Sequence, residues 1–143
     1  MFEPHLSPED RLSKFRNLRQ TPDLTQHQIV QAFADVKPAP RYLDFYTPES
    51  WPSVFEIVSD GLFCQSGITL MITSLLVYAG IVNSPEICLP AVNNTINGNQ
   101  GLVLEHNNQV YNFLPGKVVS VSQARENSVT MDMHIIKPDN LFH

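Results

Sequence analysis

Hydrophobic residues in the first half of the chain recur every three to four positions, which is the period of an α-helix. The pattern predicts three amphipathic helices, each preceded by a residue that can cap it: Ser7, Thr25 and Ser50. Their expected inward-facing residues are Leu12, Phe15 and Leu18, then Ile29, Val30, Phe33 and Ala34, then Trp51, Val54, Phe55 and Val58. A fourth helix, capped by Ser66 and ending near Gly80, is apolar on nearly every side and is expected at the centre of the fold.

The second half of the chain changes to the two-residue period of β-strands. Apolar and β-branched runs predict strands over 87–92, 101–106, 109–114, 118–121 and 129–135. Asn107 and Asn108 tolerate positive φ, so they predict a tight hairpin turn. The turn sets the expected cross-strand pairs: His106 with Gln109, Leu104 with Tyr111 and Leu102 with Phe113.

The last predicted strand alternates between apolar and polar residues. Its apolar members are expected to face the core: Val129, Met131, Met133 and Ile135. Thr130, Asp132 and His134 would then share the other face. They could form a polar site, but an exposed strand face carries such residues routinely, and we favour that simpler interpretation.

Helices first and strands second indicate an α+β fold. N-terminal helices and a buried, cysteine-bearing helix are expected to pack on a sheet of four or five antiparallel strands. The 143 residues are expected to form a single domain, 1–143, with a helical part over about 7–81 and a sheet part over about 87–136.

The chain is mildly acidic, with 9 Lys+Arg against 14 Asp+Glu. This balance argues against nucleic acid as a partner, because neutralising phosphates needs a basic surface. The N-terminus has no basic segment followed by an apolar run, and the longest apolar segment, about 68–82, is too short to span a bilayer. We therefore expect a cytoplasmic protein without a membrane partner, in which Cys64 and Cys88 are reduced.

The stretch DGLFCQSG, residues 60–67, carries the main candidate chemistry. A glycine-bracketed loop delivers the thiol of Cys64 to the start of the apolar helix, and a helix N-terminus favours thiolate over thiol. A cysteine nucleophile needs a base as well. No metal or other cofactor is expected, because no CxxC occurs and no metal-ligand spacing is present among His5, His27, His106, His134 and His143.

Six residues around this loop have a distinctive spacing: Trp51, Pro52, Phe55, Glu56, Gly61 and Cys64. They resemble the helix–loop–Cys–helix segment of bacterial transglutaminase-like proteinases, in the papain-like and transglutaminase-like group of cysteine enzymes. The resemblance covers about Trp51 to Leu114. It implies that Cys64 is the nucleophile, that a histidine starts one strand, and that an Asp or Asn lies on the next.

The chain departs from this pattern at the base. The histidine belongs where Asn99 or Gln100 stands, and glutamine cannot take a proton from a thiol at neutral pH. His106 lies at the far end of the same strand, about 20 Å from Gln100 by strand rise. Asn112 is the best match for the third residue, but the predicted register places it on the opposite face of the sheet.

These features predict a non-catalytic binding or regulatory module on a degenerate cysteine-enzyme-like frame. Its groove would run between the Cys64 loop and the 93–100 loop, lined by Gln65, Ser66, Asn99 and Gln100. The partner would be a protein or a small molecule of unknown identity. One alternative is an active thiol amidohydrolase or acyltransferase, in which His106 or His134 reaches Cys64. Another is a structural or assembly protein, for which a homo-oligomer is possible.

Overall fold

The computed structural model describes residues 5–40, 43–61 and 63–143. Its helices are α1 (Pro8–Arg19), α2 (Gln26–Ala32), α3 (Val54–Asp60), α4 (Gln65–Tyr78) and α5 (Val121–Glu126), with two short 3-10 helices, η1 (Pro48–Ser50) and η2 (Pro138–Leu141). Its strands are β1 (Ile87–Asn94), β2 (Gln100–Leu102), β3 (Leu104–His106), β4 (Gln109–Tyr111), β5 (Val118–Ser120) and β6 (Ser128–Ile136). The predicted α+β class is confirmed.

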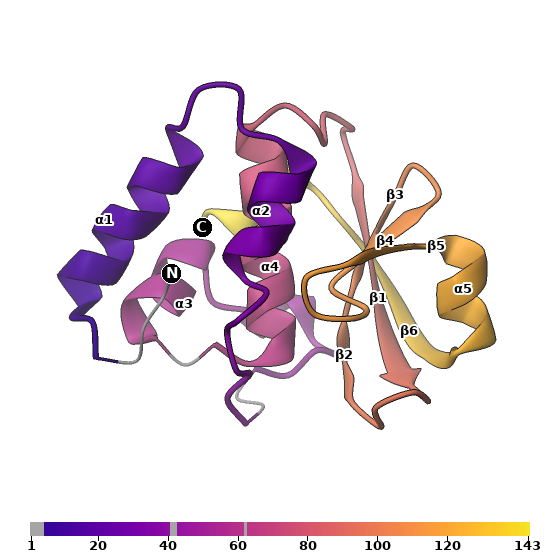
Figure 1. Ribbon diagram of the computed structural model, residues 1–143. Coiled ribbons are helices and arrows are strands. Elements are labelled where there is room, and N and C mark those ends of the chain that lie inside the picture. The colour runs from indigo at the N-terminus through magenta and orange to yellow at the C-terminus, as the bar shows by residue number, and fades with distance from the viewer. Residues whose placement is uncertain (1–4, 41–42, 62) are drawn as a thin grey trace.

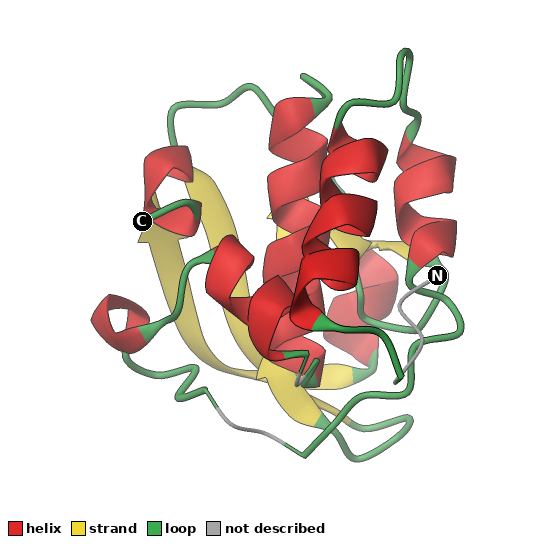
Figure 2. Cartoon of the chain, turned by 90° about the vertical axis from the view of Figure 1, so that its left-hand side faces the viewer, coloured by secondary structure: helices red, strands yellow, loops and turns green. Residues whose placement is uncertain are grey.

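The strands form one sheet with antiparallel pairing, in which β1 is central. On one side β1 pairs with β6, which lies at the edge of the sheet. On its other side β1 pairs with both β2 and β3, and the sheet continues through β4 to β5. Helices α1–α4 cover one face of the sheet, and α5 lies on the other (Figure 1). Figure 2 shows the helical layer in front of the strands.

Two hydrophobic clusters fill the two faces. The larger one lies between the helices and the sheet and includes Phe15, Ile29, Phe45, Met71 and Leu89. The smaller one lies under α5 and consists of Val92, Val103, Val110, Phe113 and Ala124. Residues Ser66 to Leu76 of α4 are all buried, which confirms the prediction of a central helix.

The first two helix starts are confirmed, and the third is wrong. Ser7 caps α1, and Thr25 forms a capping box with Gln28 at α2. Helix α3 is capped by Ser53, which exchanges hydrogen bonds with Glu56, whereas Ser50 belongs to η1. The helix cannot start at position 51, because that residue precedes a proline and is held in an extended conformation.

Replacing Ser53 with alanine is expected to lower the free energy of unfolding by about 1 kcal/mol, because it removes the acceptor for the Glu56 N–H. The matched control is Ser50→Ala, which removes only a hydrogen bond to the Thr47 carbonyl in an exposed turn. Chemical denaturation followed by circular dichroism measures both variants. Equal losses would place the start of α3 elsewhere.

The hairpin is confirmed near its turn and wrong further along. Asn107 and Asn108 both have positive φ, and the predicted pairs His106–Gln109 and Leu104–Tyr111 form. Leu102 pairs with Ala91 of β1 rather than with Phe113. The predicted strand is interrupted at Val103, whose N–H donates to the Pro90 carbonyl, so β2 and β3 are separate strands. This interruption accounts for the sixth strand.

The prediction for β6 is wrong about which face is buried. Val129, Met133 and Ile135 are 59%, 44% and 54% exposed, while His134 is 9% exposed. His134 pairs with Leu89, which faces the helices, so its side chain points into the helical layer. A register shift leaves Met131 without a paired residue on β1. This bulge places Thr130 on the opposite face of the strand from Asp132 and His134.

Helix α5 was not predicted. Val121 was expected at the end of a strand, but the strand stops at Ser120. Ser120 forms a capping box with Gln123, and this starts a helix on the outer face of the sheet. Because α5 covers only part of that face, the outward side chains of β6 near Ile135 stay exposed.

Candidate functional site

Cys64, not Ser66, caps helix α4. Its sulfur accepts the backbone N–H of Gly67 at 3.3 Å, and its carbonyl accepts the first helical N–H, from Ile68, at 2.9 Å. The thiol therefore lies at a helix N-terminus as predicted, although the predicted cap at Ser66 is wrong. Cys64 is 1% exposed, so its sulfur is largely enclosed.

A hollow of about 450 Å³ opens beside Cys64. It is lined by the extended segment 38–40, by residues 64–66 at the start of α4, and by Asn99 and Gln100 at the start of β2. The structure thus brings all the residues of the predicted groove around one hollow. Gln100, which stands where the resemblance calls for a histidine, lines the same hollow as the thiol.

The segment 38–40 is a wall of this hollow that the sequence analysis missed. The Ala39 N–H donates to the Phe63 carbonyl at 2.8 Å, and Ala39 forms a parallel bridge with Cys64. Pro38 and Pro40, on either side of Ala39, are the sequence signal for its extended conformation. Nothing in the sequence indicates that this segment contacts the cysteine.

Hydrogen bonds tie the start of α4 to β2 and to the chain after β4. Gln65 Nε2 donates to the carbonyls of Leu102 and Asn112 at 2.9 and 3.2 Å, and Ser66 Oγ accepts the Leu102 N–H at 3.0 Å. Thr69 Oγ1 donates to the Leu102 carbonyl at 2.7 Å. Gln65 and Ser66 therefore hold the architecture of the site as well as lining its hollow.

Asn112 lies near the cysteine helix, contrary to the predicted register. Its φ of 64° turns the chain after β4, and Nδ2 donates to the Gln65 carbonyl at 3.1 Å and to Thr69 Oγ1 at 2.8 Å. Asn112 is the residue that the resemblance matches to the Asp or Asn on the strand after the histidine. Its amide is bonded to α4.

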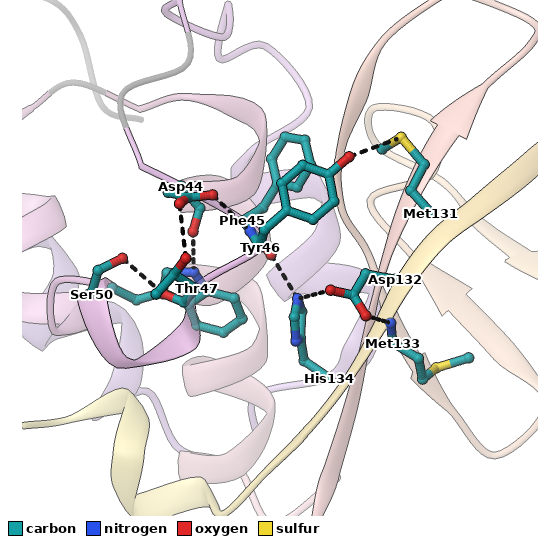
Figure 3. A network of polar contacts seen from close by, with 10 residues as sticks. Asp44, Phe45, Tyr46, Thr47, Ser50, Met131, Asp132, Met133 and His134 are labelled. Atoms are coloured by element: carbon teal, nitrogen blue, oxygen red, sulfur yellow. Dashed lines mark hydrogen bonds and ion pairs between the residues drawn. The ribbon is translucent and has the colours of Figure 1, made fainter.

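Neither histidine considered as a base lines the hollow beside Cys64. His106 is at the hairpin end of β3, paired with Gln109. His134 lies on β6, where Nε2 is 2.7 Å from the Phe45 carbonyl and 3.7 Å from Asp132 Oδ2 (Figure 3). Its ring also meets the indole of Trp51 edge-on at 5.5 Å. The expectation of a solvated His134 is wrong: the side chain links the 44–51 segment to the sheet.

Cys88 lies on the outer face of the sheet, in a setting that keeps it protonated. Burial raises the pKa of its thiol to about 11, with further contributions from the hydrogen bond to Glu105 and from that carboxylate's charge. Its sulfur is 3.5 Å from Glu105 Oε2, and Glu105 also forms an ion pair with Arg125 at 3.2 Å. Thiolate is the reactive form, so Cys88 is not a nucleophile at neutral pH.

This raised pKa predicts a loss of stability in alkali. The pKa of the thiol is about 11 in the folded protein, whereas in the unfolded chain the thiol ionises near its ordinary pKa of 9.0. The contribution of the Cys88 thiol to the free energy of unfolding is therefore complete below about pH 9 and declines towards pH 11. Urea denaturation at several pH values should show wild type losing stability relative to Cys88→Ala across this window. A difference in stability between wild type and Cys88→Ala that stays constant over this pH range would contradict the raised pKa of Cys88.

Within the described residues, no three side chains among His, Cys, Asp and Glu gather as a metal site. No helix in this part of the chain is long and apolar enough to cross a membrane.

No protein-family model matches the chain, and no curated protein matches it by sequence. Its fold is similar to that of LapG from Legionella pneumophila, a transglutaminase-like cysteine protease. A calcium-bound LapG structure aligns with a TM-score of 0.65 and 16% identity, covering 91% of this chain and 77% of LapG. A second LapG structure aligns with a TM-score of 0.57 and 15% identity, covering 94% and 90%. The chain therefore has a transglutaminase-like fold, as the resemblance around Cys64 implied.

Proposed function

We propose that this protein is a non-catalytic binding module on a cysteine-protease-like frame, and that the hollow beside Cys64 is its binding site. The observation that carries the proposal is that Cys64 and Gln100 line the same hollow. A cysteine hydrolase or acyltransferase needs an imidazole within hydrogen-bond reach of its sulfur. A glutamine amide at that place can donate and accept hydrogen bonds but cannot take the thiol proton.

The lining of the hollow indicates the chemistry of its ligand. The described residues that line it are uncharged: proline and alanine on one wall, and thiol, hydroxyl and amide groups on the others. Amide side chains offer both a donor and an acceptor, which matches the backbone of a peptide. We therefore expect an uncharged, extended segment of a partner protein rather than a charged metabolite.

The test combines a binding assay with an activity assay on the full chain. Isotope-labelled protein titrated with a panel of uncharged peptides should show resonance shifts at residues 64–66 and 99–100. Gln100→Glu places a charge in the neutral hollow and should weaken peptide binding about tenfold. Gln109→Glu makes the same change at an exposed strand position outside the hollow and should not. Hydrolysis or crosslinking of model peptides that Cys64→Ser abolishes would contradict the proposal.

A second candidate, an active thiol amidohydrolase or acyltransferase, is favoured by one observation. The sulfur of Cys64 accepts a backbone N–H at the start of α4, and helix N-termini are among the places where reactive cysteines are found. Iodoacetamide labelling at several pH values separates the two candidates. An active enzyme would be labelled at Cys64 faster than the denatured chain at neutral pH, whereas the binding module should be labelled more slowly, because the residue is enclosed.

A further inference from the structure

The hydrogen bonds of β1 determine which backbone N–H and C=O groups of β6 lie on its free edge. The Val103 N–H donates to the Pro90 carbonyl, so the carbonyl of Pro90 points towards β2 and β3. Backbone groups of successive residues along a strand point in opposite directions, so the N–H and C=O groups of Leu89 and Ala91 point towards β6. The backbone N–H and C=O groups of their partners on β6, His134 and Asp132, therefore point back to β1.

It follows that the N–H and C=O groups of Met133, Ile135 and Lys137 point away from the sheet. This edge carries the exposed side chains of Met133 and Ile135. The strand nearest the C-terminus, at the border of the sheet in Figure 2, is this edge. A long, apolar, unpaired edge is a site for strand pairing with another chain.

Two groups on the edge already have partners. The Met133 N–H donates to Asp132 Oδ1 at 2.8 Å (Figure 3), and the Lys137 carbonyl accepts the Asn140 N–H at 3.0 Å. Within the described residues β6 pairs only with β1, so the outward-pointing Met133 carbonyl, both groups of Ile135 and the Lys137 N–H have no such bond. The free edge therefore offers a specific pattern of donors and acceptors rather than a uniform ladder.

We propose that a second copy of this chain pairs with this edge, antiparallel, about a two-fold axis at Ile135. Each Ile135 N–H then donates to the carbonyl of the partner's Ile135, and each Lys137 N–H donates to the carbonyl of the partner's Met133. A regular ladder would also have the Met133 N–H donate to the carbonyl of the partner's Lys137, but both of these groups are already bonded within their own chain, so this one bond is not formed. This register leaves no edge group of these three residues unsatisfied.

Side chains support the same register. Ile135 would lie against the partner's Ile135, which removes two half-exposed apolar side chains from water. Met133 would lie opposite the partner's Lys137, on the same outer face as Ile135, and symmetry repeats this pair. The patch is complementary to itself, as a two-fold interface requires.

Pairing over so few residues makes a small interface, so a reversible dimer with a dissociation constant of about 10–100 µM is expected. Sedimentation equilibrium of the full chain over this concentration range measures it. Ile135→Lys should raise the dissociation constant at least about tenfold, because a lysine at the axis puts two like charges together. Val129→Lys makes the same change on the same strand, at a similarly exposed position outside the pairing, and should change it less than about twofold.

Crosslinking provides a second measurement that does not depend on the lysine variants folding. Directly opposite residues of a hydrogen-bonded antiparallel pair have Cα atoms about 5.5 Å apart, within the range of a disulfide. Both variants are made in a Cys88→Ala background, because Cys88 lies directly opposite position 135 in the same chain and would otherwise form the disulfide. Mild oxidation of Ile135→Cys should then give a covalent dimer, and Val129→Cys should not. A wild-type protein that stays monomeric, or equal crosslinking of the two cysteine variants, would overturn the proposal.

Discussion

Replacing Gly101 with alanine is expected to lower the free energy of unfolding by about 3 kcal/mol. A Cβ at this position would lie 1.8 Å from Gln65 Oε1 and 2.9 Å from Ser66 Oγ. The Gln65 side chain cannot simply swing aside, because its Nε2 donates to the carbonyls of Leu102 and Asn112. Relief of the clash therefore breaks two hydrogen bonds that join α4 to the sheet.

The matched control is Gly67→Ala. A Cβ there would meet Ile57 Cγ2 at 3.4 Å and the Cys64 sulfur at 3.6 Å, which are ordinary contacts, and alanine favours the helix. Thermal and chemical denaturation should show Gly67→Ala within about 1 kcal/mol of wild type. In a Gln65→Ala background, Gly101→Ala should cost less than in wild type, because the closest clash is gone. An unchanged cost would show that Gln65 is not the obstacle.

The local parts of the fold could be predicted because their causes are local. The caps at Ser7 and Thr25 and the turn at Asn107–Asn108 depend on residues within three positions of each other. Cys64 was placed at a helix start for the same reason. Where a local rule was overlooked, the prediction failed: Pro52 excludes the helix start after Ser50.

The long-range parts could not be predicted because a short window does not contain the partner. Alternation in β6 defines two faces, but which face is buried depends on β1 and on the bulge at Met131. Ser66 has the chemistry of a cap, yet its oxygen is bonded to Leu102, a contact between residues far apart in the sequence. The residues of the predicted groove line one hollow because both of its ends, Cys64 and Gln100, lie where an element begins.

The contacts around Cys64 also show what joins the cysteine-bearing helix to the sheet. Asn112, which the resemblance associates with catalysis, is bonded to the start of α4 and contributes to the join between helix and sheet. Gln65 and Ser66 bond to the same strand. These residues stabilise the architecture whether or not the thiol reacts. Gln100 is the exception, because its exposed side chain lines the hollow and makes no such bond in the described part of the chain.

Gln100→His is accordingly expected to speed the alkylation of Cys64 at neutral pH by about tenfold or more. An imidazole in this hollow can accept the thiol proton and leave a thiolate–imidazolium pair, and thiolate is the form that iodoacetamide attacks. Asn97→His is the matched control, because it adds the same group to the same loop outside the hollow that Cys64 lines. Mass spectrometry of Cys64 labelling over time gives both rates. If the two variants react at the same rate, Gln100 does not occupy the place of the base. If wild type already reacts as fast as Gln100→His, the thiol is activated without a histidine, and the non-catalytic proposal loses its main support.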